Sequence, residues 1–530
     1  MSPDAAKATE AAKAIAAGYE TDKPAIDLGR VSVDGVVDNE AVVKVPLGMF
    51  NRHGLIAGAT GTGKTVTLQL LAENLSANGV PVVVADMKGD LSGLSAAGDP
   101  AGPAGERFKE LGVAYEPAAF PVEYLSLGGI GDGVPVRATI SDFGPQLLAK
   151  ILGSNDTQEQ SLALLFHYAD ERQLPLVDLE DLRAMLMFLD SDEGKADLKG
   201  IGGVSSQTVG VLLRQITALG DAGGDEYFGE TQFDVADLMR VAPDGRGVIS
   251  SIELPAVQDK PALFSTALMG LIAELFETLP EAGDLDKPKL VFFFDESHLL
   301  FSDASKAFLE SVAQTVRLIR SKGVGIFFVT QNPTDIPAEV LSQLGARVQH
   351  ALRAFTPDDA KALKQTVSTY PKSEYYDLSE VLTSLGIGEA VVTVLSSKGI
   401  PTPVAYTRLL SPRSRMGVAD NVKGTTAQSK LWPKYAQRVD PQSAKEILEG
   451  RLAESAAAPG ATPAPAPVSE GAPPAEGKPL PAPKAPKAEK AAKPKKDDGN
   501  AVTDFLKSSQ GKQIQNQIIR GAFGILKKKI

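Results

Sequence analysis

One eight-residue segment, Gly58–Thr65 with the sequence GATGTGKT, constrains the fold of this 530-residue chain more than any other. It follows the apolar run HGLIAG and precedes a stretch of helical character from Leu68 to Asn78, so the order is strand, glycine-rich loop, helix. In such a loop, backbone N–H groups and the helix N-terminus surround phosphate groups. The pattern GxxxxGK followed by Ser or Thr, in this context, predicts an ATP site in an α/β domain.

Each residue type in the loop has a predicted role. The three glycines let the backbone turn tightly and approach the ligand, Lys64 would reach the β- and γ-phosphates, and Thr65 would bind Mg²⁺. The predicted nucleotide contacts within the loop are Gly58, Ala59, Thr60, Gly61, Thr62, Gly63, Lys64 and Thr65.

A second apolar run, Leu290–Phe294, ends in two acids, Asp295 and Glu296. In open α/β sheets, ligands bind at the carboxyl ends of the strands, so both carboxylates are expected at the nucleotide. We predict that Asp295 holds Mg²⁺ through water and that Glu296 polarises the attacking water; a solvated strand end is the alternative. The apolar run 325–330 is followed by Gln331, which is a candidate sensor of the γ-phosphate. The alternative is a strand-end amide that caps a loop.

Four segments resemble, in order, the HerA/FtsK superfamily of P-loop motor ATPases, and more narrowly the bacterial HerA-helicase-like ATPases. They are GATGTGKT, VVVADMKGD (Val82–Asp90), FFFDESH and RLIRSKGVGIFFVTQNP (Arg317–Pro333). The resemblance covers residues 45–410 and the closing stretch Ile518–Leu526. It implies a RecA-like core with a mostly parallel sheet, bound ATP and Mg²⁺, and assembly of identical subunits as a hexameric ring around DNA.

The resemblance also implies an arginine that reaches the γ-phosphate from the neighbouring subunit. The matching position is Arg320, with Arg317 one turn earlier. Arg347 and Arg353, which come after the apolar run 325–330 and Gln331, are secondary candidates.

The segment after the second strand offers further candidates. Asp86, with Lys88 and Asp90, matches the family's second-strand motif, so these residues would line the nucleotide site or relay its state. A plain turn at the end of a strand is the alternative. We interpret His298 as a local hydrogen-bonding residue rather than a catalytic one, and the other three histidines as structural.

Composition excludes several function classes. The absence of cysteine excludes disulfides, thiolate metal sites and cysteine nucleophiles, and four histidines leave little metal chemistry beyond magnesium. No apolar run approaches the ~18 residues of a membrane span, so we expect no transmembrane segment and a cytoplasmic location. The net charge is −12, but residues 478–530 carry +9, which leaves −21 for the remainder.

Composition and periodicity divide the chain into seven expected segments. They are an N-terminal tail without fixed structure (1–23), a small β-element (24–48), the first part of the ATPase core (49–120), a helical insertion (121–245), the second part of the core (246–450), a disordered Ala/Pro/Lys linker (451–500) and a basic amphipathic helix (501–530). Only about 25 residues are available for the N-terminal β-barrel expected in HerA itself, so that barrel is reduced or absent.

Two functional hypotheses follow. The first is a ring-forming, ATP-driven DNA translocase or helicase. The second is an ATPase that acts on protein or at the membrane surface, as a secretion or assembly motor or a regulatory switch. The second rests on the basic C-terminal helix, which could contact a partner protein, anionic lipid or DNA. Nucleotide binding without turnover is a third possibility, and Glu296 argues against it.

Overall fold

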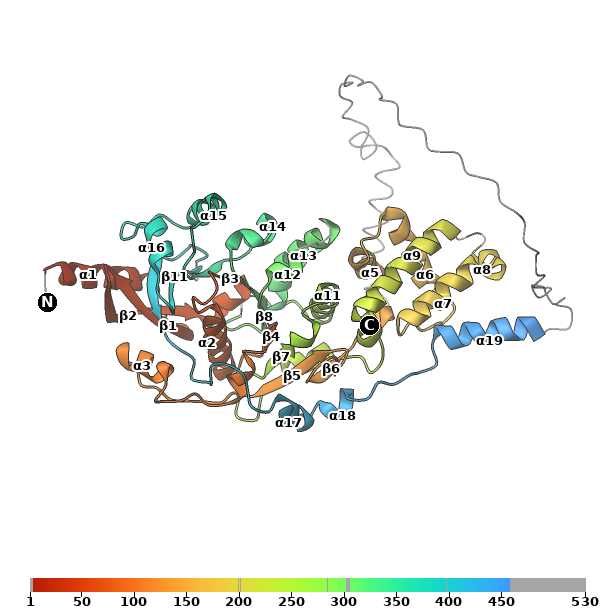
Figure 1. Ribbon diagram of the computed structural model, residues 1–530, viewed down its shortest axis with the longest axis horizontal. Coiled ribbons are helices and arrows are strands. Elements are labelled where there is room, and N and C mark those ends of the chain that lie inside the picture. The colour runs from red at the N-terminus through yellow and green to blue at the C-terminus, as the bar shows by residue number, and fades with distance from the viewer. Residues whose placement is uncertain are drawn as a thin grey trace, which may run out of the picture. The chain divides into compact units, whose positions relative to one another are not determined.

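The computed structural model describes residues 3–457, apart from residues 199, 201, 284, 302–305 and 397. Within these residues the strands form one twelve-stranded sheet in the order β2-β1-β12-β11-β10-β3-β9-β8-β4-β7-β5-β6 (Figure 1). The strands are β1 (Ala25–Val33), β2 (Val36–Pro46), β3 (Gly54–Ala57), β4 (Val82–Asp86), β5 (Val122–Leu127), β6 (Val134–Val136), β7 (Ile249–Glu253), β8 (Leu290–Phe294), β9 (Val324–Thr330), β10 (Ala346–Gln349), β11 (Glu389–Thr393) and β12 (Ala405–Leu409).

The sheet has a parallel part and an antiparallel part. Every neighbouring pair from β10 to β6 is parallel, whereas β10, β11, β12, β1 and β2 pair antiparallel in that order. The carboxyl ends of β10, β3, β9, β8, β4 and β7 therefore meet at one edge of the sheet. This arrangement confirms the predicted α/β class with a mostly parallel sheet.

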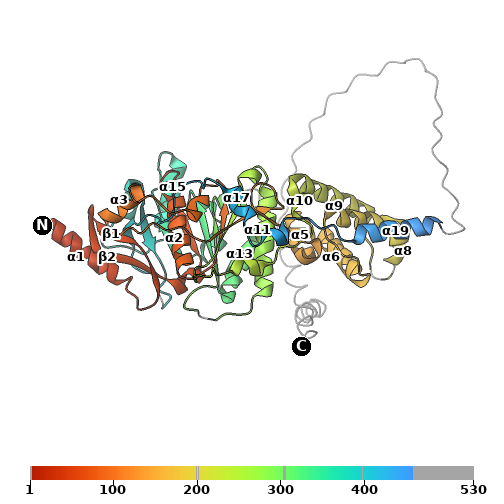
Figure 2. The ribbon, with the colours of Figure 1, turned by 90° about the horizontal axis from the view of Figure 1, so that it is seen from below.

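Helices cover both faces of the parallel part, and the sequence of β8 shows why. Phe292 and Phe294 belong to the hydrophobic core that includes α11 (Pro261–Thr278) and α13 (Lys306–Ile319), which lie side by side (Figure 2). Phe293 belongs to the core on the other face, with α1 (Pro3–Ala17) and α2 (Lys64–Ala77). Strands buried on both faces are continuously apolar rather than alternating, as the run LVFFF is.

The predicted N-terminal tail is ordered from residue 3 onward, so the expectation of disorder for that part is wrong. Residues Pro3–Ala17 form α1, which packs on β1 and β2 and buries Ala8, Ala12 and Ile15. The Tyr19 hydroxyl then donates hydrogen bonds to the carbonyl oxygens of Val392 (2.8 Å) and Pro403 (2.6 Å). The low hydrophobicity of this helix gives no sign in the sequence that it is ordered, because the surface on which it packs belongs to strands β1 and β2.

The small β-element expected at 24–48 is the hairpin β1–β2, which joins the main sheet through β12. The segment expected as a helical insertion from residue 121 begins instead with β5 and β6, which extend the sheet beyond β7. These strands are short, so the helical periodicity of the residues that follow dominates the sequence pattern there and gives no sign of a strand. The helices that follow are α4 (Ile140–Phe143), α5 (Pro145–Ile151), α6 (Asp156–Glu171), α7 (Leu179–Asp190), α8 (Asp192–Asp197), α9 (Ser206–Leu219) and α10 (Asp225–Tyr227).

Residues 410–443, which we call the strap, run from β12 along the core to the helices of this segment. The buried carboxylate of Glu73 in α2 accepts hydrogen bonds from the backbone N–H groups of Arg413 (2.8 Å) and Ser414 (3.0 Å). Further along, the Arg137 guanidinium donates to the carbonyl oxygen of Tyr435 (3.0 Å). The strap therefore links the helix of the predicted nucleotide site to the far end of the sheet.

The remaining helices are α3 (Pro103–Glu110), α12 (His298–Phe301), α14 (Ala338–Leu341), α15 (Pro357–Val367), α16 (Leu378–Ser384), α17 (Val422–Ala427), α18 (Trp432–Tyr435) and α19 (Ala444–Ala457). Helix α19 continues into the linker expected from residue 451. The rest of that linker and the amphipathic helix expected at 501–530 lie outside the described residues. Within the described part of the chain, no helix is both long and apolar enough to cross a membrane.

Candidate nucleotide site

The glycine-rich loop joins the carboxyl end of β3 to α2 and is tied to both neighbouring strands. The Gly58 N–H donates to the carbonyl oxygen of Thr330 at the end of β9 (3.2 Å). The Ala59 N–H donates to that of Ala351, just beyond β10 (2.8 Å). Gly61 and Gly63 have φ values of 80° and 108°, which L side chains rarely adopt. The loop thus forms an open turn with glycine where the backbone requires it.

Lys64 is the first residue of α2 and is almost buried. Its ammonium group donates to the Ala59 carbonyl oxygen (3.2 Å), so the side chain curls under its own loop. Burial lowers the pKa of Lys64, while the charge of Glu296 opposes that shift. Thr65 follows as the second residue of α2 and is half-buried.

A buried histidine, His350, packs against the loop and the first turns of α2. The Nε2 atom of His350 lies 2.9 Å from the Thr67 hydroxyl of α2, and burial lowers the pKa of His350 to about 4, so the ring is neutral. A Cβ atom at Gly58 would lie 2.5 Å from the His350 Cβ, closer than packed carbon atoms approach. His350 thus has the structural role expected for it, and the close approach explains the first glycine of the loop.

Asp295 and Glu296 follow β8 at the same edge of the sheet and are 2% and 7% exposed. Burial, and next the charge of Glu296, raises the pKa of Asp295 to about 7. Among the described residues, Oδ2 of Asp295 and Oε2 of Glu296 have no hydrogen-bond partner although both atoms are buried. Glu296 also has a φ of 46°, a left-handed conformation that costs ~1 kcal/mol for a non-glycine residue. One buried oxygen of each carboxylate is therefore available to a ligand.

Lys88 faces the same acid pair from the end of β4. Its ammonium group forms an ion pair with Oε1 of Glu296, and Nδ1 of His298 lies 3.4 Å from Oε2. Burial by itself would raise the pKa of Glu296, but the Lys88 hydrogen bond and the charges of Lys88, His298 and Lys64 lower it overall. Nδ1 of His298 has no hydrogen-bond partner among the described residues, so the expectation that His298 is a local hydrogen-bonding residue stays a prediction.

Asp86 ends β4 and is fully buried. Its carboxylate accepts hydrogen bonds from the backbone N–H groups of Lys88 (3.1 Å), Gly89 (2.7 Å) and Leu91 (2.9 Å). Asp86 therefore organises the turn that carries Lys88, which is the structural alternative considered for this segment.

Three carboxylates at this edge form a group that suits a hard cation. One oxygen each from Asp86, Asp90 and Asp295 lies within 4.8 Å of the others. Carboxylate oxygens are the ligands that Mg²⁺ prefers, and the unpartnered Oδ2 of Asp295 is a buried acceptor without a donor among the described residues. The residues present therefore fit a magnesium ion beside the loop.

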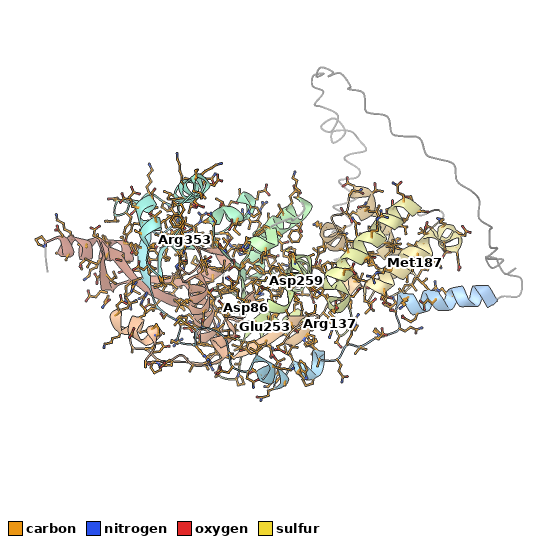
Figure 3. All side chains as sticks on the ribbon, in the orientation of Figure 1. Asp86, Arg137, Met187, Glu253, Asp259 and Arg353 are labelled. Carbon is orange, nitrogen blue, oxygen red and sulfur yellow. The ribbon has the colours of Figure 1, made fainter. Side chains whose placement is uncertain are left out.

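Gln331 follows β9 and is exposed. It lines a cavity of about 500 Å³ together with loop residues Ala59 and Thr60, and with His298. Arg353 borders the same cavity, where its guanidinium donates to the carbonyl oxygen of Thr60 (3.3 Å), and Figure 3 labels its position. Arg353 is thus next to the loop of its own chain.

Arg320 is not at this site within one chain. It begins a 3-10 turn ahead of β9, whereas Gln331 follows the other end of that strand. Seven strand residues span ~23 Å. Arg320 lies instead near His53, which precedes β3, and its charge adds to the burial that lowers the pKa of His53 to about 4.

The two other candidate arginines, Arg317 and Arg347, lie in different surroundings. Arg317 is exposed on α13. The Arg347 guanidinium donates to the hydroxyl of Thr369 (2.5 Å) and lies over the Tyr370 ring. Neither residue contacts the loop in these interactions.

Glu253 is a residue of this region that the sequence did not single out. It ends β7 opposite Asp86 in the register of β4 and β7, and Figure 3 labels the two side chains close together. Burial, and then the charge of Asp86, raises the pKa of Glu253 to about 8. Like Asp86 and Asp295, Glu253 is an acid at the end of an apolar strand, and this position is the sequence signal that could have identified it.

A phosphate-binding loop, an acid pair and a glutamine thus follow three adjacent strands of a parallel sheet, at one edge. That combination of fold and site defines the class of P-loop ATPases with a RecA-like core. The chain belongs to the helicase HerA-like C-terminal family, whose model matches residues 33–529. The match confirms the predicted HerA/FtsK membership.

Individual relatives are distant. The chain is 21% identical over 366 residues to the DNA double-strand break repair helicase HerA of Saccharolobus solfataricus, covering 69% of this chain and 66% of the relative. It is 23% identical over 385 residues to a probable helicase of Methanocaldococcus jannaschii, covering 67% and 66%. The chain thus spans just under two thirds of these curated relatives. A solved structure of the plasmid coupling protein TrwB with a non-hydrolysable ATP analogue is 17% identical, with a TM-score of 0.49, covering 76% of this chain and 99% of that one.

Proposed function

We propose that this chain is a cytoplasmic, ATP-hydrolysing motor that assembles as a homo-oligomeric ring, with six subunits, and translocates along or unwinds DNA. One observation carries the proposal. In a chain of the HerA-like family, Lys64 of the loop shares one sheet edge with Asp295 and Glu296, and both acids keep a buried oxygen that accepts no hydrogen bond from the described residues. The relatives named as helicases support the choice of DNA as the substrate.

Within this proposal each residue has a chemical role. Lys64 and the backbone N–H groups of Gly58–Thr65 bind the phosphates, while Thr65 and Asp295 hold Mg²⁺. When bound, Mg²⁺ neutralises charge on the phosphates. Glu296 orients and polarises the attacking water, and Gln331 contacts the γ-phosphate from the end of β9.

Arg320 would act on the site of a second copy of the chain. Its position at the end of β9 opposite Gln331 supports this assignment, because the ~23 Å length of the strand separates it from the loop of its own chain. An arginine supplied by a neighbour stabilises charge that develops on the transferred phosphate.

The test is ATP turnover by wild type and Glu296→Gln, at low salt, with and without single-stranded and duplex DNA. We expect DNA to stimulate wild-type turnover, and the substitution to lower turnover by ~100-fold or more while ATP binding persists. The matched control is Glu226→Gln, which changes an exposed glutamate outside the site. Absence of DNA-stimulated hydrolysis in the wild type would refute the choice of substrate.

Two further measurements address assembly and the C-terminal segment. The mass of the protein in solution with nucleotide reports whether six copies associate. Deletion of residues 455–530, with liposome and DNA binding compared, separates the DNA motor from the protein or membrane-surface motor. Loss of liposome binding alone would favour the membrane-surface motor.

A further inference from the structure

The acid pair of the site is engaged by a second lysine besides Lys64. The Lys88 ammonium contacts Oε1 of Glu296, and its charge also acts on Asp295 and Asp90. In this arrangement Oε1 of Glu296 is engaged by an ammonium group and is not directed to a water molecule alone.

Hydrogen bonds hold the backbone around Lys88, whereas its side chain is half-exposed. The Asp86 carboxylate holds the turn, and the Gln258 side chain donates to the Met87 carbonyl oxygen. The hydroxyl of Ser92 accepts from the Ala419 N–H of the strap (2.9 Å). The Lys88 side chain is nevertheless 49% exposed, so it can leave Glu296 without a change in the turn.

The balance of charges at the site indicates when the Lys88 ammonium group would leave Glu296. Four carboxylates gather here, those of Asp86, Asp90, Asp295 and Glu296, and Lys88 offsets part of their repulsion. A metal ion at Asp295 would take over that role and repel the Lys88 ammonium, while the phosphates would attract it. Entry of ATP and Mg²⁺ therefore weakens the Lys88–Glu296 pair.

We propose that Lys88 is a positioning residue that holds Glu296 through Oε1 before ATP and Mg²⁺ bind, and that its release frees Glu296 to polarise water. This inference rests on the proposed ATP hydrolysis. If it holds, Lys88 controls the rate of ATP hydrolysis without DNA. The strap contacts the same turn through Ala419 and Ser92, so a change in the strap would also affect that rate.

The test compares wild type, Lys88→Met, Lys88→Arg and Lys88→Met combined with Glu296→Gln. Methionine keeps the length of the side chain without its charge. We expect Lys88→Met to raise turnover without DNA by about three- to tenfold, the range that a half-exposed ion pair supports, with little change in KM for ATP. Stimulation by DNA should fall correspondingly. Lys88→Arg should stay within about twofold of wild type, and the double variant should be inactive. Lys109→Met, at an exposed lysine on α3, is the matched control.

A tenfold or greater loss of turnover in Lys88→Met, with ATP still bound, would overturn the proposal, because Lys88 would then assist the reaction. A second measurement does not depend on hydrolysis. Acetylation of Lys88, quantified by mass spectrometry without nucleotide, should be faster in Glu296→Gln than in wild type. Equal labelling would refute the contact. Faster labelling in Glu296→Gln, together with a wild type that hydrolyses no ATP, would support the contact and refute the proposed function instead.

Discussion

Replacing Glu253 with glutamine should change the dependence of folding stability on pH. Glu253 is 8% exposed at the end of β7, where the Ser251 hydroxyl donates to its Oε1 atom (2.8 Å). Burial, followed by the charges of Asp86 and Asp132, raises its pKa from 4.5 to about 8. The folded protein therefore holds this proton more tightly than the unfolded chain, so stability falls as pH rises from about 4.5 to about 8. Glutamine keeps an acceptor for Ser251 and carries no charge to bury.

The size of the stability change follows from the part of the pH range between 4.5 and 8 that the experiment covers. Each pKa unit corresponds to ~1.4 kcal/mol, and about two units of the range lie between pH 6 and pH 8. Relative to wild type, Glu253→Gln should therefore gain ~3 kcal/mol of stability between pH 6 and pH 9. Among the pH values tested, pH 6 lies nearest the lower end of the range from 4.5 to 8, so the gain of Glu253→Gln relative to wild type should be smallest there.

Urea unfolding at pH 6, 7.5 and 9 measures this difference, with the fluorescence of Trp432, the single tryptophan of the chain, as the signal. Other groups titrate in both proteins, so the difference between them isolates Glu253. Glu226→Gln is the control: it changes an exposed glutamate and keeps Glu253, so its stability should follow that of wild type at all three pH values. A stability difference between Glu253→Gln and wild type that is the same at all three values would refute the assignment of a buried, proton-binding Glu253.

Three other perturbations test the supports of the site. Glu73→Ala should destabilise the fold by ~3–5 kcal/mol, since two backbone N–H groups of the strap lose a buried charged acceptor; urea unfolding measures it, with Glu73→Gln expected to cost less. Gly58→Ala should weaken ATP binding by ~10-fold or more in a fluorescent-nucleotide titration, because its Cβ would meet His350, and unchanged affinity would contradict this. Arg320→Ala should lower turnover by ~1,000-fold yet recover part of it when mixed with Glu296→Gln subunits, whereas no recovery would argue against action between copies.

The sequence predicted the parts of the site that depend on local order along the chain. Gly58–Thr65, Asp295 and Gln331 each follow an apolar strand, and parallel pairing brings the carboxyl ends of those strands together. Strand length, burial on both faces and the residue after the strand are all local properties. Their meeting at one edge therefore needed only the assumption of a parallel sheet.

Features that depend on distant partners could not be predicted in the same way. The ion pair of Lys88 with Glu296 joins residues 208 positions apart, and the register that places Glu253 opposite Asp86 exists only after β4 and β7 pair. The alanine-rich sequence of helix α1 shows no strong apolar face, which by itself favours disorder. Its order comes from the hairpin β1–β2, whose surface the sequence of residues 3–17 does not contain.

The opposite ends of β9 have a consequence for assembly. If Gln331 reads the phosphates at one end and Arg320 acts on phosphates from the other, a single chain presents half of a site on each of two different surfaces. Two copies then associate head to tail, with the Arg320 surface of one copy against the loop surface of the next. Such a heterologous contact does not close in a dimer, because each added copy again exposes both halves. It repeats until the rotation between copies closes a ring or continues as a filament. On this reasoning, the ring is the state in which every copy has a complete site, and monomers should hydrolyse ATP slowly even with Glu296 intact.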